Sequence, residues 1–385
     1  MKRHRLTVKN LAQIKDADIE FGDLTVLVGP QASGKSLLLQ LWKFALDRKE
    51  IVPALREAGD DVSSRAALLD AVLGQGMHAG WTNRTEVVAD GVPINPDTAG
   101  KYIREGHQPS AFFIPAHRGL LLADGWAQPF GRMNATVPVV ARLFSDALNQ
   151  RFVLTGVDQL SPRKHELKRE YRDVLDAALF HGGTVRLMRR EGRTFRLSLT
   201  YGKTDLPFMT WTAGQREATP LLFGLMQVLP SKSKPTVPGL EWVIVEEPEM
   251  GLHPRAIDAV MLLVLECLFR GYRVVLSTHS PLVLDVAWAL KRFHAHGSDA
   301  HFLIDALGAE STQSMRRVAA AAIKKDVRVH ALTMDGRFQV RSVDISELDP
   351  SSDNEAESGW GGLTSFSSRI GDAVAAAANE AESRK

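Results

Sequence analysis

The eight residues from Gly29 to Ser36, GPQASGKS, place the strongest constraint on the fold. They match the pattern G-x-x-x-x-G-K-[ST], follow the apolar run Leu24–Val28 and open a helical stretch at Ser36–Asp47. Glycines let a backbone curl around phosphates and point N–H groups inward, and the helix N-terminus adds positive potential. We therefore expect an α/β fold in which Lys35 contacts the β and γ phosphates of a nucleotide and Ser36 binds Mg²⁺. The candidate nucleotide-binding residues are Gly29, Pro30, Gln31, Ala32, Ser33, Gly34, Lys35 and Ser36.

A second run, Trp242–Glu249, has the sequence WVIVEEPE and predicts a buried strand that ends in acidic residues. Carboxylates at the end of a parallel strand lie near the phosphate loop of a neighbouring strand. Glu246 is then a candidate Mg²⁺ ligand, and Glu247 is a candidate to orient or deprotonate the attacking water. The alternative is a solvated charge cluster behind a core strand. For Glu249, a cap of the following turn and a direct role stay open.

A third polar strand end follows Arg273–Ser277, in the sequence Ser277-Thr-His-Ser-Pro281. His279 at this position is a candidate contact for the γ phosphate, and a structural histidine is the alternative. Further upstream, Trp211–Glu217 (WTAGQRE) joins a strand to a helix. On its own this motif is weak, but it lies after the phosphate loop and before the two acidic and polar strand ends.

In this order the motifs resemble those of ABC-type ATPases of the RecF, SMC and overcoming-lysogenisation-defect group, over roughly residues 5–305. Within that group the chain looks similar to prokaryotic proteins labelled AAA-family ATPases. The resemblance implies an ABC-type P-loop nucleotide-binding domain with ATP and Mg²⁺ as cofactors and ATP hydrolysis as its activity. GPQASGKS corresponds to the Walker A motif, TAGQRE to the signature, VIVEEPE to Walker B, GLHP to the D-loop and STHSP to the switch. Lys35, Glu247 and His279 would be the catalytic residues.

The resemblance also implies pairing, because in this family the signature of one protomer closes over the ATP of the other. Thr212, Ala213, Gly214 and Gln215 would then act in trans. The physical logic agrees, since a helix beginning near Gly214 directs N–H groups toward a phosphate, and a two-fold pair supplies this contact twice. We expect a homodimer or a higher even-numbered oligomer. Two residues depart from the common pattern: Gln31 replaces Asn, and Glu246 replaces Asp.

A further element, Ile114–Gly119 (IPAHRG), follows an apolar strand at Ala111–Ile114 and resembles the IPxxR element of the family. His117 or Arg118 would contact the γ phosphate or the partner protomer. A plain structural turn is the equally weighted alternative.

The predicted domain organisation has three parts. Residues 1–305 form the ATPase domain, with a mixed central sheet, an N-terminal β-subdomain and a helical and β-meander insertion at about 120–210. Residues 306–348 form an α/β extension that contains a hairpin turning at Asp335-Gly336, and residues 349–385 form an acidic, mobile linker and a terminal helix.

Within these parts, Trp242–Val245, Arg273–Ser277 and His301–Ile304 are expected strands of a largely parallel sheet. The insertion is expected to hold two helical pieces broken at Ser161-Pro162. A meander with turns at Glu191-Gly192 and Tyr201-Gly202 should follow.

Composition limits the partners. The 385 residues carry a net charge of +2, so a nucleic-acid surface would have to be local. Residues 163–203 hold eleven basic and five acidic residues, which suits either a nucleic-acid backbone or a solvated helix and hairpin. Apolar runs are too short for a membrane span, and the single cysteine, Cys267, lies in an apolar stretch that predicts a core helix. We expect a cytoplasmic protein without a membrane partner.

Relatives often carry a C-terminal Toprim nuclease, which needs a D-x-D pair, and VDISELD near the C-terminus has none. We therefore expect an ATP-gated sensor or clamp that controls a separate nuclease or toxin in a prokaryotic phage-defence system. A RecF-like DNA repair ATPase and a non-hydrolysing nucleotide-dependent scaffold stay open as alternatives.

Overall fold

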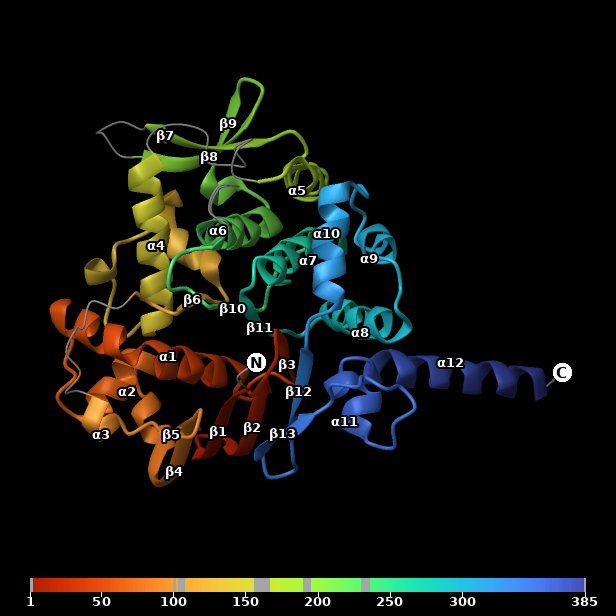
Figure 1. The fold of residues 1–385 in the computed structure, drawn as a ribbon, viewed down its shortest axis with the longest axis horizontal. Helices are drawn as coiled ribbons and strands as arrows, with labels where there is room; N and C mark the ends of the chain where they lie inside the picture. The colour runs from red at the N-terminus through yellow and green to blue at the C-terminus, as the bar shows by residue number, and fades with distance from the viewer. Residues whose placement is uncertain are drawn as a thin grey trace.

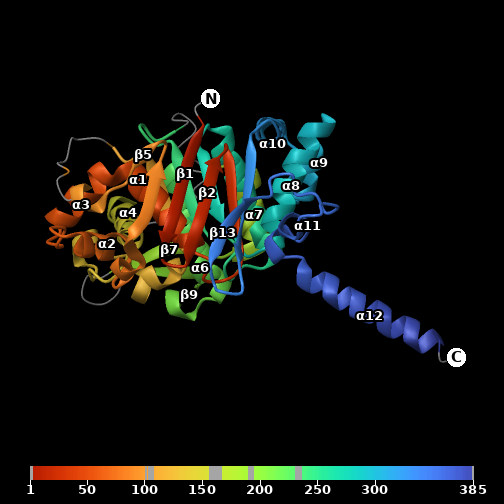
Figure 2. The ribbon, with the colours of Figure 1, turned by 90° about the horizontal axis from the view of Figure 1, so that it is seen from below.

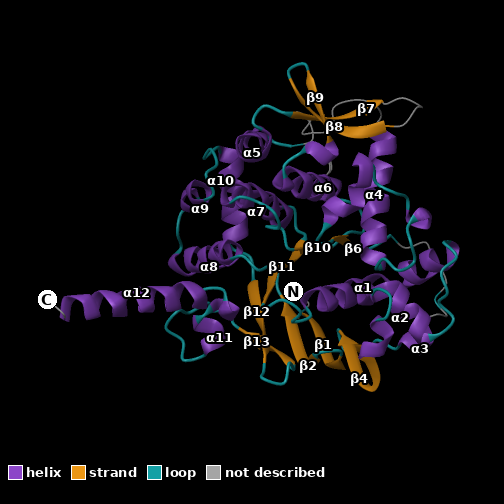
Figure 3. Ribbon diagram, turned by 180° about the vertical axis from the view of Figure 1, so that it is seen from behind, coloured by secondary structure: helices purple, strands orange, loops and turns teal. Residues whose placement is uncertain are grey.

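Two β-sheets with helices between them form the molecule (Figure 1). The computed structural model describes residues 3–99, 102, 108–155, 167–189, 195–229 and 236–383. One sheet has ten strands and the other has three. Figure 3 shows the small sheet at one end of the molecule and strands β1, β2 and β4 at the opposite end.

The ten-stranded sheet is mixed, as the sequence predicts. Its strands, in spatial order, are β5 (Val92–Pro93), β4 (Trp81–Ala89), β1 (His4–Leu11), β2 (Ile14–Phe21), β13 (Val340–Asp344), β12 (Val327–Met334), β3 (Leu24–Val28), β11 (Arg273–Ser277), β10 (Trp242–Glu246) and β6 (Ala111–Ile114). The five strands from β12 to β6 are parallel to one another. Strands β1, β2, β4 and β5 pair antiparallel and form the N-terminal β-subdomain of the same sheet (Figure 2).

The central strands are buried on both faces because successive side chains point into two different cores. Val26 of β3 packs in the core that contains α6 (Ala213–Val228), α7 (Pro254–Phe269), α8 (Pro281–His296) and α10 (Gln313–Ile323). The next residue, Leu27, packs in the core that contains α1 (Lys35–Glu57) and α2 (Arg65–Leu73). Helix α7 is buried along most of its length, and Cys267 is fully buried within it, which confirms the predicted core helix.

The insertion carries the predicted helices and meander. Helices α4 (Val139–Thr155) and α5 (Arg169–Leu175) precede the antiparallel strands β7 (Thr184–Arg189), β8 (Phe195–Tyr201) and β9 (Thr204–Pro207). A turn at Gly202 joins β8 to β9. The expected breaks at Ser161-Pro162 and Glu191-Gly192 lie outside the described residues.

The predicted strand at His301–Ile304 is wrong, because these residues begin helix α9 (His301–Ala306). Leu303 and Ile304 are buried whereas Phe302 is 52% exposed, so the apolar run covers one face of a short helix. The position beside β3 in the sheet is occupied by β12, which forms the predicted hairpin with β13. A four-residue apolar run is compatible with either structure, and tertiary pairing decides between them.

The acidic segment 349–364 also differs from the expected mobile linker. It contains α11 (Glu355–Ser358) and a 3-10 turn at Trp360–Gly362. The Trp360 side chain is 8% exposed and belongs to the core beside α8, with its ring centroid 6.4 Å from that of Trp288. Beyond this anchored turn, α12 (Ser365–Ser383) projects from the body, as the predicted terminal helix (Figure 2). No helix in the described part of the chain is long and apolar enough to cross a membrane.

Candidate nucleotide-binding site

The phosphate loop joins the end of β3 to the start of α1. Gly29 and Gly34 have φ angles of +143° and +90°, which side chains with a Cβ rarely adopt. A Cβ at Gly29 would lie 2.5 Å from the carbonyl oxygen of Leu332 on β12. The glycine spacing of the motif therefore reflects both backbone conformation and the close approach of a neighbouring strand.

Lys35 is held over this loop. Its side chain is buried, and Nζ donates to the carbonyl oxygens of Gly29 at 2.8 Å and Pro30 at 3.0 Å. Burial lowers the pKa of Lys35 to about 8, although the nearby charges of Glu247 and Glu249 oppose the change. The ammonium group is thus positioned for a phosphate that would replace the carbonyl contacts.

Glu246 ends β10 with its carboxylate inside the protein. Oε2 accepts a hydrogen bond from the backbone N–H of Ala116 at 3.0 Å, and Oε1 is buried without a hydrogen-bond partner. Burial raises the pKa of Glu246, and the Ala116 N–H and the Ser36 hydroxyl oppose that rise. Mg²⁺ is commonly bound by one or two carboxylates together with substrate phosphates. The unpartnered oxygen of Glu246 and the adjacent Ser36 hydroxyl fit a Mg²⁺ ion bound with a nucleotide.

Glu247 is more exposed than Glu246 and lines the cavity that also contains Lys35. Its φ angle is +43°, and its backbone N–H donates to the carbonyl oxygen of Ser277 at 2.9 Å. Its Oε1 lies 3.5 Å from Nε2 of His279, and 28% of its side chain is exposed. Burial lowers the pKa of His279, and the Lys35 charge adds to this effect. Glu247 and His279 therefore lie together at the solvent side of the strand ends.

Glu249, for which the sequence left a cap and a direct role open, bridges two loops at the strand ends. Its Oε1 accepts hydrogen bonds from the hydroxyl of Thr278 at 2.8 Å and the N–H of His279 at 2.7 Å. These hydrogen bonds connect the acidic loop after β10 to the polar loop after β11. The bond to the His279 N–H also fixes the backbone from which the imidazole projects.

A cavity of about 640 Å³ collects these groups. Its lining contains Gln31–Ser36 of the phosphate loop, together with Glu247, His279 and the predicted His117. The remaining lining residues are Gln13, Leu37, Gln40, Leu73, Met77 and Met250. Sequence reasoning missed Gln13, whose Nε2 donates to the carbonyl oxygen of Ala32 at 2.8 Å. No local pattern marks Gln13, because only the pairing of β2 in the sheet brings its turn to the phosphate loop.

The signature segment begins α6 with an exposed N-terminus. Thr212 accepts a hydrogen bond from the N–H of Gln215, and the Gln215 side chain accepts one from the N–H of Thr212. Thr212 and Ala213 are exposed. A Cβ at Gly214 would lie 3.1 Å from the carbonyl oxygen of Gly251, so the D-loop residue packs closely on the first turn of α6.

The side chain of Gln215, a residue of the predicted signature, makes contacts within its own subunit. The side chain is buried, and Nε2 donates to the carbonyl oxygen of Leu179 at 2.9 Å. Gln215 therefore connects the signature helix to the insertion of its own subunit.

Arg118 is likewise different from the phosphate or partner contact that was one of its two expected roles. Its side chain is fully buried and donates to backbone carbonyls of its own chain. These contacts lie within one subunit, as the structural alternative for Arg118 predicts. His117, with a φ angle of +49°, lines the nucleotide cavity instead.

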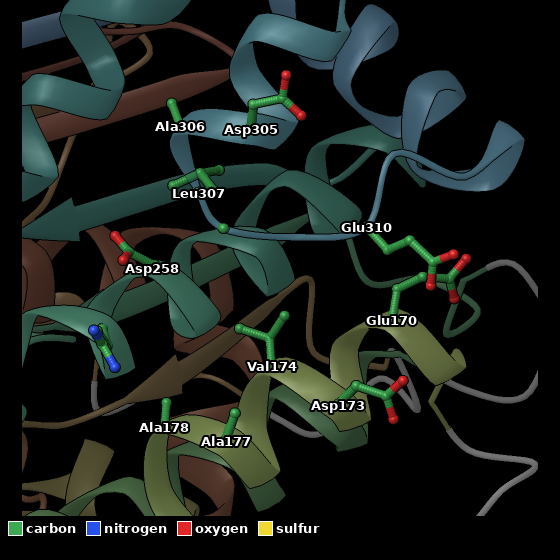
Figure 4. Close-up of a pocket in the computed structure, with 12 residues that line it drawn as sticks. Glu170, Asp173, Val174, Ala177, Ala178, Asp258, Asp305, Ala306, Leu307 and Glu310 are labelled. Atoms are coloured by element: carbon green, nitrogen blue, oxygen red, sulfur yellow. The ribbon is translucent and has the colours of Figure 1, made fainter.

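A second cavity, of about 540 Å³, lies between α5, α7 and the end of α9 (Figure 4). Glu170, Asp173, Asp258, Asp305 and Glu310 line it together with Arg255. Burial raises the pKa of Asp258, which is therefore less solvated than its place on a helix suggests. This acidic cavity contains none of the phosphate-loop residues.

Residues 104–285 match a protein family described as "AAA domain, putative AbiEii toxin, Type IV TA system". This range includes Arg118, the signature and the two acidic and polar strand ends, and it begins after the phosphate loop. No curated protein sequence matches the chain.

The fold is similar to three solved structures of SMC heads. One is the SMC head bound to the C-terminal winged-helix domain of ScpA, with 11% identity, a TM-score of 0.45 and coverage of 89% of this chain and 97% of that chain. The Thermotoga maritima SMC head domain has 14% identity and a TM-score of 0.37, with coverage of 89% and 99%. The SMC head with an extended coiled coil bound to the ScpA C-terminal domain from Pyrococcus furiosus has 10% identity and a TM-score of 0.41, with coverage of 89% and 96%. The family match and the strand–loop–helix geometry together support an ATPase domain of the AAA type.

Proposed function

We propose that this protein binds and hydrolyses ATP and that it does so as a pair of subunits. The observation that carries the proposal is the meeting of Lys35, Glu247 and His279 in one cavity, with the Ser36 and Glu246 oxygens beside it. A bound Mg²⁺ ion would neutralise charge on the β and γ phosphates. Ser36 and Glu246 are the residues that would hold it.

The chain's own residues divide the remaining work. Lys35 binds the phosphate chain, and the backbone N–H groups of the loop surround it. Glu247 orients the attacking water and accepts its proton, because its carboxylate is partly exposed at the cavity. His279, held through its N–H by Glu249, contacts the γ phosphate.

The phosphate loop would cover one side of a nucleotide bound in the cavity, so a surface of a second subunit could cover the other side. Thr212 and Ala213 at the exposed N-terminus of α6 suit this contact, since a helix N-terminus attracts phosphate. A two-fold pair would place this surface over each nucleotide. A homodimer, or a higher even-numbered oligomer, follows from this arrangement.

The biological role that fits is an ATP-gated sensor or clamp acting with a separate effector in prokaryotic phage defence. The matched family's description names a toxin and a toxin–antitoxin system, which supports a system of more than one component. A RecF-like DNA repair ATPase predicts salt-sensitive duplex binding that requires ATP, through residues 163–203. A non-hydrolysing scaffold predicts ATP-dependent pairing without turnover.

The Glu247→Gln variant tests the ATPase proposal. The amide keeps the size of the side chain but cannot accept the water proton, so the variant should bind ATP, lose at least about 10²-fold in turnover and accumulate as a dimer. ATP turnover and mass in solution, each with and without ATP, measure these outcomes. Fast turnover by Glu247→Gln would exclude Glu247 as the general base, and a monomer in saturating ATP would exclude the pairing.

A further inference from the structure

The Arg118 guanidinium lies at the junction of three segments that the proposed reaction uses. Its side chain is 0% exposed, and it follows the strand β6 in the IPAHRG loop. Nη1 donates to the carbonyl oxygens of Glu246 at 3.1 Å and Glu247 at 3.3 Å, and Nη2 donates to those of Glu247 at 3.3 Å and Pro248 at 3.5 Å. A single side chain thus holds three consecutive residues of the catalytic loop by their backbone.

The same side chain reaches the signature helix. Nε of Arg118 donates to the carbonyl oxygen of Glu217 on α6 at 3.1 Å, and Nη1 also donates to that of Pro115 at 3.3 Å. The next residue adds a second connection between this loop and α6, because the N–H of Gly119 donates to Oε2 of Glu217 at 3.2 Å. The helix that presents Thr212 is therefore connected to the backbone of Glu247 through one guanidinium group.

The backbone held by Arg118 has a conformation that needs support. Glu247 has a φ angle of +43° and His117 has one of +49°, and both are unfavourable for residues with a Cβ. Such conformations persist only where the surroundings fix them. The planar fork of an arginine spreads five N–H donors over several acceptors, whereas a lysine offers a single point of donation.

We propose that Arg118 is a positioning residue that aligns the Glu247 carboxylate for hydrolysis by joining the Glu246–Pro248 backbone to the signature helix. This inference rests on the proposed ATPase function. A partner's nucleotide that engages Thr212 would stabilise α6, and Arg118 would transmit that order to Glu247 in the same subunit. ATP binding itself depends on the phosphate loop, which Arg118 does not touch.

The test compares Arg118→Lys with Arg142→Lys. Arg142 is an equally buried arginine at 1% exposure, and its Nη1 forms an ion pair with Asp60 at 2.8 Å, remote from the cavity lining. Each lysine keeps a buried positive charge and loses the fork. Arg118→Lys should lower kcat about 10²-fold, since small displacements of a catalytic group have effects of that size, and should leave the Kd for ATP within about threefold. Arg142→Lys should leave kcat and Kd near wild type.

Glu217→Ala provides a second variant for the case in which Arg118→Lys does not fold. Glu217 is only partly buried and lies in a helix, where alanine is well tolerated. Its loss removes the acceptor for Gly119 and the carboxylate charge that most stabilises the Arg118 guanidinium, and it should lower kcat several-fold, again with an unchanged Kd for ATP.

The outcomes separate the two proposals. No turnover by the wild-type protein overturns the ATPase function and with it the role of Arg118. If the wild type turns over ATP and folded Arg118→Lys has an unchanged kcat, the positioning role alone is overturned. If Arg118→Lys does not fold, an unchanged kcat in Glu217→Ala has the same consequence. A fall in kcat of equal size in Arg142→Lys would also overturn it, because any buried arginine would then have the same effect.

Discussion

The low pKa of Lys35 predicts that ATP binding weakens in mildly alkaline solution. With a pKa of about 8, the protonated fraction of Lys35 falls from about 0.9 at pH 7 to about 0.1 at pH 9. If only the charged form binds the phosphates well, the apparent Kd is inversely proportional to the protonated fraction. The apparent Kd for ATP should therefore rise about tenfold between pH 7 and pH 9. An ordinary lysine, with a pKa of about 10.4, would stay charged over this range and give almost no change.

Fluorescence titration with a labelled ATP analogue, at saturating Mg²⁺ and constant ionic strength, measures this dependence. The Glu247→Gln protein is suitable because the nucleotide stays intact. Burial and the Lys35 charge lower the pKa of His279, which reduces the contribution of this imidazole to the slope above pH 7. Lys35→Arg is the control, because a guanidinium group remains protonated at pH 9. A flat profile for the Glu247→Gln protein, or an equal slope when Lys35→Arg is added to it, would refute the assignment to Lys35.

The free protein should show the opposite trend in its stability. The pKa of Lys35 in the folded state lies below the ordinary lysine value of 10.5, so the unfolded chain binds this proton more tightly. Stability contributed by this group therefore rises with pH between about 8 and 10.5, and it is lowest below pH 8. Denaturant unfolding of the wild type against Lys35→Arg at pH 8 and pH 10 compares the two slopes, and equal slopes would contradict the sign.

Three substitutions test the packing that supports the site, with the free energy of unfolding in urea as the measurement. Gly29→Ala should cost about 1–3 kcal/mol, because the new Cβ meets the carbonyl oxygen of Leu332 in an unfavourable backbone conformation. Arg142→Met should cost about 3–5 kcal/mol, since it leaves the buried Asp60 carboxylate without its partner. Trp360→Ala should cost about 3 kcal/mol if the acidic segment is anchored by this side chain. A cost near zero would show that Trp360 does not anchor the segment.

Sequence reasoning located the half-site that lies within one chain because its signals are local. The glycines of the phosphate loop, the apolar strands and their acidic or polar ends are each contained in fewer than ten consecutive residues. Residues whose position depends on pairing between distant segments were not found. Gln13 reaches Ala32 only because β2 and β3 lie in one sheet, and nothing in its neighbours indicates that approach.

The errors have a common physical cause, which is that a local pattern does not show which surface a residue will meet. His301–Ile304 is apolar enough for a strand, yet it begins helix α9, and β12 forms the strand beside β3. Acidic composition at 349–364 suggested a solvated linker, whereas one buried residue, Trp360, holds the segment against the core. For Gln215 the signature motif gives no sign that its side chain donates to the carbonyl oxygen of Leu179 in its own subunit.

The adjacent carboxylates Glu246 and Glu247 illustrate how the fold separates two chemical roles that the sequence presents as one acidic pair. Strand alternation directs Glu246 inward, where burial raises its pKa and a bound cation would favour its charged form. At Glu247 the chain leaves the sheet with a positive φ angle, which directs the carboxylate to the cavity beside His279. Because the same guanidinium group holds both backbones, the proposed metal binding at Glu246 and the proposed water activation at Glu247 would both depend on one turn. Exchange of the two roles would require the turn to be rebuilt, so Glu246→Gln should weaken the Mg²⁺ dependence of ATP binding whereas Glu247→Gln should leave it unchanged. Equal Mg²⁺ dependence in the two variants, measured by the same titration, would contradict this division.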